Sequence, residues 1–217
     1  MSKNFKGYLG DQIGKLGTAV GRRWKRKMVY ASYQGKVRNP RTEKQVEARL
    51  RFAALSKLAS AFLGAIDKGF KKMSEMRQTT TGNCFVSMNY TAVTLDEGGM
   101  VDVRFSKLAV SDGSLPAVTF GTADFSEPET VSVPFQGNGD QPNTDPKDEV
   151  YLFAYQPDLN QGMLSAAALR SQGTARMTVP STWQGMQVHI YGFAVGDSDK
   201  KRGVASESDY IGSGTIA

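Results

Sequence analysis

The stretch "EVYLFAY", residues 149–155, is an unbroken run of β-branched, aliphatic and aromatic residues after its first position, a composition typical of a β-strand. Similar runs occur at "VDVRF" (101–105), "VSVPF" (131–135), "TARMTV" (174–179) and "QVHIYGFAV" (187–195). Apolar residues alternate with other residues in several of them, as at Val131, Val133 and Phe135. These runs predict strands.

Turn-forming clusters separate the predicted strands. They are "LDEGG" (95–99), "SDGSLP" (111–116), "QGNGDQPNTDP" (136–146) and "GDSDKKRG" (196–203). Their spacing predicts about seven or eight strands in an antiparallel β-sandwich, of immunoglobulin-like or fibronectin-like type, over residues 81–217. Because Cys84 is the single cysteine, the disulfide-linked antibody form of that fold is excluded.

A helix is predicted before the strands. In "NPRTEKQ" (39–45), Pro40 suits the first turn of a helix, and Thr42 and Gln45 have the spacing of a capping box. Apolar residues then recur at i, i+3, i+4 and i+7. The pattern predicts one long, largely buried amphipathic helix from Thr42 to about Arg77, within a segment 42–80. The expected fold class is therefore α+β.

Residues 1–41 are rich in glycine and in basic residues. Glycine recurs at helical steps of 3, 4, 3 and 4, at Gly7, Gly10, Gly14, Gly17 and Gly21. Since a glycine inside a helix costs roughly 1 kcal/mol relative to alanine, we expect an extended or partly helical arm that is ordered by packing on something else. Strand formers in "TAV" (18–20) and "MVYASY" (28–33) also favour a hairpin with a basic tip.

Charge is distributed unevenly along the chain. Residues 1–80 hold 19 Lys and Arg against 5 Asp and Glu, a net charge of 19 − 5 = +14. Residues 81–217 hold 8 against 16, a net charge of 8 − 16 = −8. This asymmetry indicates that the first part meets a polyanion, such as DNA or RNA, or an acidic protein surface, which includes the acidic part of a neighbouring copy.

The candidate contact residues are cations interleaved with aromatic side chains. Cations neutralise phosphates and aromatic rings stack on bases, but Arg and Trp also anchor protein interfaces, so nucleic-acid binding, protein assembly and an idle solvated surface stay open. The candidate residues are Arg22, Arg23, Trp24, Lys25, Arg26, Lys27, Tyr30, Tyr33, Lys36, Arg38 and Arg41.

Catalytic and metal-binding motifs are not recognisable. His189 lies within a predicted strand, and Cys84 has no identifiable base, so the first is expected to be a strand residue and the second a small buried hydrophobe. An acidic loop has enough oxygen atoms for calcium but lacks the EF-hand order, and a solvated loop is expected there: Asp140, Asn143, Asp145, Asp148 and Glu149. We therefore expect no enzyme activity, no bound metal and no cofactor.

The N-terminal pattern resembles an uncharacterised Bacteroidetes family that is known only as a domain of unknown function. The matching residues are Gly7, Leu9, Gly10, Gly14, Lys15, Gly17, Val20, Gly21, Trp24 and Lys25, then "VRNPRT" (37–42), Gln45, Arg49 and Phe52. Weaker similarity continues through "SDGSLP", "VPSTWQGMQVHIYGFA" and "SDYIGSG". Family members often carry a less charged "W-K-G" turn where this chain has "WKRK". The resemblance implies the two-part architecture and supplies no activity.

These observations lead to one main hypothesis and two alternatives. The main one is a non-enzymatic structural protein, most concretely a phage-type virion component, whose basic arm contacts copies of itself, other assembly proteins or nucleic acid. The first alternative is a cytoplasmic nucleic-acid-binding protein without sequence preference. The second is a surface or carbohydrate-binding sandwich that uses Trp183 and Tyr191 as stacking platforms. No run approaches the roughly 18 apolar residues of a membrane span, and no secretory signal is recognisable, so cytoplasmic synthesis is expected.

Overall fold

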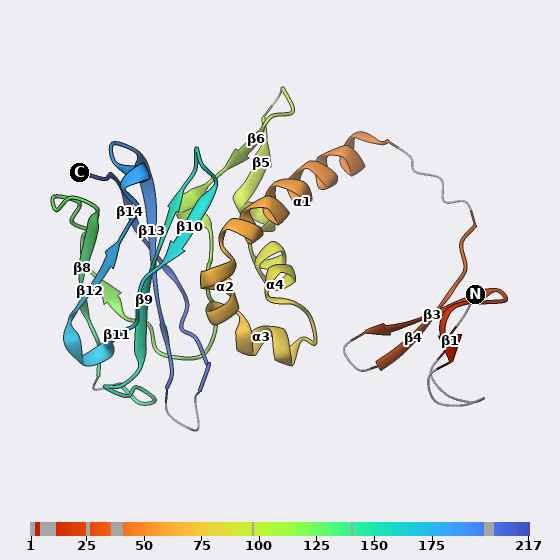
Figure 1. Ribbon diagram of the computed structural model, residues 1–217, viewed down its shortest axis with the longest axis horizontal. Helices are drawn as coiled ribbons and strands as arrows, with labels where there is room; N and C mark the ends of the chain where they lie inside the picture. The colour runs from red at the N-terminus through yellow and green to blue at the C-terminus, as the bar shows by residue number, and fades with distance from the viewer. Residues whose placement is uncertain are drawn as a thin grey trace. The chain divides into compact units, whose positions relative to one another are not determined.

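The computed structural model describes residues 3–4, 12–24, 27–35, 41–96, 98–139, 141–197 and 202–217. The chain divides into two units, Met1–Gln45 and Val46–Ala217 (Figure 1). The first is a small sheet and the second combines helices with antiparallel sheets, so the α+β class is confirmed. No described helix is both long and apolar enough to cross a membrane.

The first unit is a four-stranded antiparallel sheet with the order β1-β2-β3-β4. Its strands are β1 (Lys3–Asn4), β2 (Gln12–Leu16), β3 (Ala19–Trp24) and β4 (Lys27–Ser32). Leu16 pairs with Ala19, so the turn between β2 and β3 has two residues, and Gly17 supplies the positive φ of 59° that such turns favour. The partly helical arm that the glycine period predicts is therefore wrong for residues 12–24, which form strands. The β3–β4 hairpin follows the strand-forming runs that predicted it.

Helices open the second unit. They are α1 (Glu43–Ala61), α2 (Leu63–Gly69), α3 (Lys71–Met76) and α4 (Thr81–Met88), and short 3-10 turns follow at η1 (Tyr90–Ala92), η2 (Phe105–Lys107), η3 (Arg170–Gln172) and η4 (Ser181–Trp183). The prediction of one long helix is therefore wrong, because it is divided at Phe62 and Phe70. Both residues lie near ψ = 0°, with ψ of 4° and 8°, and both rings are fully buried. The change of direction at each break lets the ring enter the core.

The region predicted as a sandwich, residues 81–217, opens with a helix rather than a strand, at the stretch "QTTTGN" (78–83). Thr80 has an extended backbone, and its Oγ1 accepts a hydrogen bond from the backbone N–H of Asn83 at 3.1 Å. This is the geometry of an N-cap, and α4 begins at Thr81. The first strand of the second unit starts only at Val93.

Three antiparallel sheets follow. The central one has the order β10-β9-β13-β14, with β11 also paired to β9; a second has the order β12-β8-β7, and β5 pairs with β6. The strands are β5 (Val93–Leu95), β6 (Val101–Val103), β7 (Thr119–Phe120), β8 (Thr130–Gln136), β9 (Glu149–Gln156), β10 (Gln161–Leu164), β11 (Ala168–Leu169), β12 (Thr174–Thr178), β13 (Gln187–Val195) and β14 (Asp209–Thr215). All five runs predicted as strands contain one, although "VDVRF" is a strand only to Val103.

The central sheet is buried on both faces, which explains why "EVYLFAY" is apolar throughout. Alternate side chains of β9 point to opposite faces. Tyr151, Phe153 and Tyr155 belong to a core shared with the helices, the helix-side core. Val150, Leu152 and Ala154 belong to a core shared with β8 and β12, the sheet-side core. Figure 1 shows the resulting layers: β8 and β12, then the central sheet, then α2, α3 and α4.

Candidate partner-binding surface

The predicted contact residues lie mainly on the β3–β4 hairpin of the N-terminal sheet. Trp24 at the end of β3 pairs with Lys27 at the start of β4, so the strands meet directly at the basic tip. Lys25, Arg26, Lys36 and Arg38 lie outside the described residues. Arg41 is exposed and precedes α1 by two residues.

Strand pairing divides the remaining candidates between the two faces of the sheet. Directly paired residues share a face, and successive residues alternate. The pairs Trp24–Lys27, Arg22–Val29 and Lys15–Val20 define one face, called the Trp24 face. The pairs Gly21–Tyr30, Arg23–Met28 and Leu16–Ala19 define the other, called the Tyr30 face. The aromatic residues that the sequence groups together therefore do not form one platform.

Large apolar side chains are exposed on both faces. Trp24 is 51% exposed on one face, and Tyr30 is 53% and Leu16 49% exposed on the other. Tyr33, 49% exposed, follows β4, and the ammonium of Lys15 lies 3.8 Å from the centre of its ring, a cation–π contact. The sheet thus presents cations and aromatic rings together, as the sequence predicts.

The N-terminal sheet has no hydrophobic interior among its described residues. Over residues 12–24 and 27–35, Gly21 is the single buried residue. Gly21 lies so close to the neighbouring strand that an added Cβ would be 2.0 Å from the backbone oxygen of Gln12. Among these residues, backbone pairing rather than side-chain burial joins the strands.

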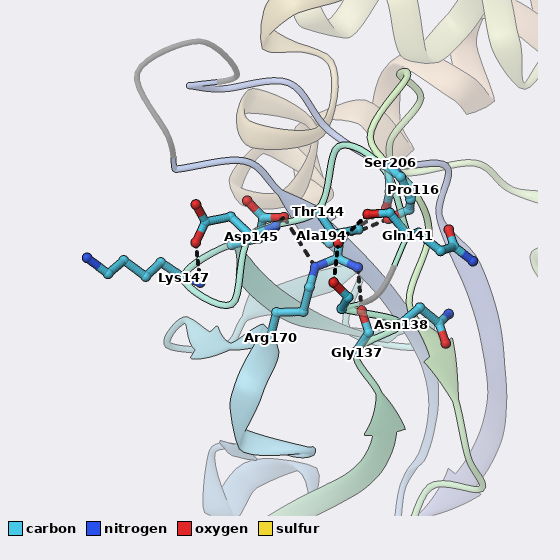
Figure 2. Close-up of polar contacts among 12 residues, drawn as sticks. Pro116, Gly137, Asn138, Gln141, Thr144, Asp145, Lys147, Arg170, Ala194 and Ser206 are labelled. Carbon is cyan, nitrogen blue, oxygen red and sulfur yellow. Dashed lines mark hydrogen bonds and ion pairs between the residues drawn. The ribbon is translucent and has the colours of Figure 1, made fainter.

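A buried ion pair fixes the acidic loop of the second unit. Nε of Arg170 lies 3.2 Å from Oδ2 of Asp148, with side-chain exposures of 1% and 0%. The guanidinium also donates to the carbonyl oxygens of Gly137 at 2.6 Å and Pro116 at 2.8 Å, as Figure 2 shows. The negative charge of the Asp148 carboxylate is therefore balanced by the Arg170 guanidinium. Asp140 lies outside the described residues, and the described part of the chain holds no group of three acidic, His or Cys residues arranged for a metal ion.

A second polar group, which sequence reasoning missed, joins α2 to β9. The Tyr151 hydroxyl accepts from Nζ of Lys68 at 2.8 Å and donates to the carboxylate of Glu149. Burial, with the hydrogen bond and charge of Glu149, raises the pKa of Tyr151, so the ring stays neutral near pH 7. A tyrosine that acts as a general base needs a lowered pKa. This group is a structural link; nothing in the local sequence signals it, because Lys68 and Tyr151 are 83 residues apart.

The remaining residues considered for chemistry or sugar binding lie in the second unit. Cys84 is 1% exposed, as expected for a small buried hydrophobe. Trp183 is 1% exposed and Tyr191 is fully buried, so neither presents a surface for stacking on a sugar. His189 is half-buried on β13, where its ring stacks on Phe105 and its Nδ1 lies 2.9 Å from the Tyr210 hydroxyl.

These features define a class: an α+β protein whose packed second unit carries a basic, aromatic N-terminal sheet. The chain belongs to the family of unknown function DUF6266, whose model matches residues 10–212. The resemblance to a domain of unknown function is thus confirmed, whereas the Bacteroidetes origin and the individual motifs stay predictions. A search of curated proteins finds no match to the chain.

Proposed function

We propose that this protein is a non-enzymatic structural component of a larger assembly, most concretely of a phage-type virion. In this proposal the N-terminal sheet contacts neighbouring subunits, which are copies of this chain or other assembly proteins. The packed second unit forms the body of the subunit. The paired sheets of that body are proposed to be a variant of the immunoglobulin-like or fibronectin-like sandwich, supported by two antiparallel sheets packed through one apolar core.

The observation that carries the proposal is a sheet that, over residues 12–24 and 27–35, exposes large apolar side chains and buries only Gly21. Small isolated sheets are marginally stable in water, and exposed apolar surface marks sites of association. Trp24, Tyr30 and Leu16 are each about half exposed, on opposite faces of one thin sheet. A partner that covers either face would bury aromatic area and stabilise the pairing of the strands.

Charge supports a protein partner. The net charge of +14 over residues 1–80 is complementary to the net charge of −8 over residues 81–217, so an acidic surface is available on every neighbouring copy. Aliphatic residues between the cations, such as Val20 and Val29 on the Trp24 face, suit a protein interface better than a phosphate backbone.

Nucleic-acid binding without sequence preference is the second candidate. It is favoured by the Trp24 face, where Lys15, Arg22 and Lys27 lie on the same side as the indole ring. In a virion the same face would meet packaged nucleic acid. If the five charges of Arg22, Arg23, Lys25, Arg26 and Lys27 all contacted phosphates, affinity would fall by roughly two to three orders of magnitude between 50 and 200 mM salt.

The test is the mass of the protein by light scattering across a salt series, with and without mixed-sequence DNA. Wild type is compared with a five-serine variant that replaces Arg22, Arg23, Lys25, Arg26 and Lys27. An oligomer larger than a dimer that forms without DNA and that the variant loses supports assembly. Salt-sensitive DNA binding by a monomer, abolished in the variant, favours the second candidate. A monomer that binds no DNA in either form contradicts both.

A further inference from the structure

Helix α1 has exposed apolar side chains on a side that does not pack in the helix-side core. Leu55 and Leu58 face the helix-side core, and no residue of α1 before Leu55 is buried. Val46 is 39% and Leu50 37% exposed, although both are aliphatic. Figure 1 shows the first turns of α1 running away from the sheets of the second unit.

These exposed residues form a regular seam along the helix. Glu43, Val46, Leu50, Ala53 and Lys57 follow one another at steps of 3, 4, 3 and 4, the a and d positions of a heptad repeat, and all five are exposed. They occupy one side of α1 over roughly 21 Å, at 1.5 Å per residue. We call this row the α1 seam. Leu55 and Leu58 lie on a different side of the helix.

We propose that the α1 seam packs antiparallel against the α1 seam of a second copy of this chain. The pattern is self-complementary: the apolar centre is Val46, Leu50 and Ala53, and the ends carry opposite charges, Glu43 and Lys57. An antiparallel arrangement brings Glu43 of each copy near Lys57 of the other, at both ends of the contact. A parallel arrangement would place like charges together, which is unfavourable.

The resulting contact is isologous, since the same surface is used by both copies, and it closes into a dimer with twofold symmetry. This inference rests on the proposed function: a structural subunit of an assembly needs a second contact besides the N-terminal sheet, and the α1 seam would supply it. The seam is short, so the dimer should dissociate on dilution and be strengthened when the N-terminal sheet is also engaged.

The test uses the full chain carrying the five-serine substitution, so that contacts through the basic hairpin are weakened. Sedimentation should give twice the chain mass of 23.6 kDa at high concentration. Adding Leu50→Glu should halve that mass without changing the melting curve, since the side chain is exposed. Phe52→Ser is the matched control: Phe52 is 55% exposed but lies off the seam, so the mass should stay unchanged.

Cysteine cross-linking determines the orientation. A mixture of Glu43→Cys and Lys57→Cys chains should form a disulfide-linked dimer under mild oxidation, whereas each chain alone should form little. Monomers at every concentration, an equal loss with Phe52→Ser, or a dimer cross-linked through Cys at position 43 of both copies would each overturn the proposal. If only the seam fails while the five-serine substitution still removes wild-type assembly, the proposed function stands without this inference.

Discussion

Arg170 and Asp148 form a buried ion pair, with 3.2 Å between Nε and Oδ2. Burial lowers the pKa of the Arg170 guanidinium, and the charge of Asp148 opposes that shift. The carbonyl oxygens of Gly137 and Pro116 accept hydrogen bonds from Nη1 and Nη2 of Arg170, so one side chain fastens the segments around Pro116, Gly137 and Asp148.

Breaking this pair should be costly. Arg170→Met leaves the Asp148 carboxylate buried without its cation, which should lower the free energy of unfolding by about 3–5 kcal/mol in urea titrations. The exposed pair Lys72–Glu75, 3.7 Å apart, is the control, and Lys72→Met should change stability by less than about 0.5 kcal/mol. Similar losses in the two variants would contradict the assigned role of Arg170.

Phe62 should be among the most sensitive positions in the helix-side core. Its buried ring lies 4.7 Å from the ring centre of Phe153 and 4.8 Å from that of Tyr155. Phe62→Ala should cost about 3–5 kcal/mol of unfolding free energy, from lost burial and the cavity left behind. Phe52→Ala, at an exposed position, should stay within about 0.5 kcal/mol of wild type. A small loss for Phe62→Ala would show that the core rearranges around the gap.

Gly21→Ala should disrupt the N-terminal sheet alone. The added methyl would lie 2.0 Å from the Gln12 carbonyl oxygen, so β2 and β3 must separate. Hydrogen–deuterium exchange of amides in residues 12–32 should accelerate, while exchange in β9 and β13 stays at the wild-type rate. Gly35→Ala meets only a ring atom of Tyr33 at 3.7 Å and should exchange as wild type does. Unchanged protection in Gly21→Ala would contradict the register of β2 against β3.

His189 should make stability depend on pH. Burial lowers the pKa of His189 below its ordinary value of 6.5, so at mildly acidic pH the unfolded chain binds a proton that the folded chain does not. The stability that the neutral ring contributes is therefore present above pH 6.5 and is lost as pH falls toward the folded pKa. Urea titrations at about pH 7.5 and about pH 5.5 should show a smaller fall for His189→Gln than for wild type. An equal loss of stability between the two pH values in wild type and His189→Gln would show that His189 is not the source of the pH dependence.

Local composition predicted those elements, such as the strands, whose formation depends on residues adjacent in the sequence. "EVYLFAY" is a strand because β-branched and aromatic side chains suit a pleated, buried surface. Both of its faces are apolar because one packs in the helix-side core and the other in the sheet-side core. The divisions at Phe62 and Phe70 had a weaker signal, the nearby glycines Gly64 and Gly69, at which a bend could be expected. Neither residue is a proline. The Phe62 ring packs against Phe153 of β9 and Tyr191 of β13, and the Phe70 ring is buried in the helix-side core.

The candidate surface was predictable in composition but not in geometry. The sequence places Trp24 and Tyr30 in one basic, aromatic stretch, yet only the pairing register assigns them to opposite faces. The glycine steps of 3 and 4 suggested a helical arm because periodicity does not distinguish a helix face from turns and close strand contacts. Arg170 and Asp148 are 22 positions apart, and no local pattern signals their pairing.

In the described part of the N-terminal sheet the large side chains are exposed, so substitutions there would be hard to detect in the purified protein. Changes at Trp24, Tyr30 or Leu16 remove no buried side chain, so purified protein would keep its yield and its melting temperature. Quality control in the cell, which responds to unfolding, would accept such chains as readily as wild type. In the assembly proposed above, the defect of such chains would emerge when subunits compete for places, where a chain with an altered sheet would be outnumbered.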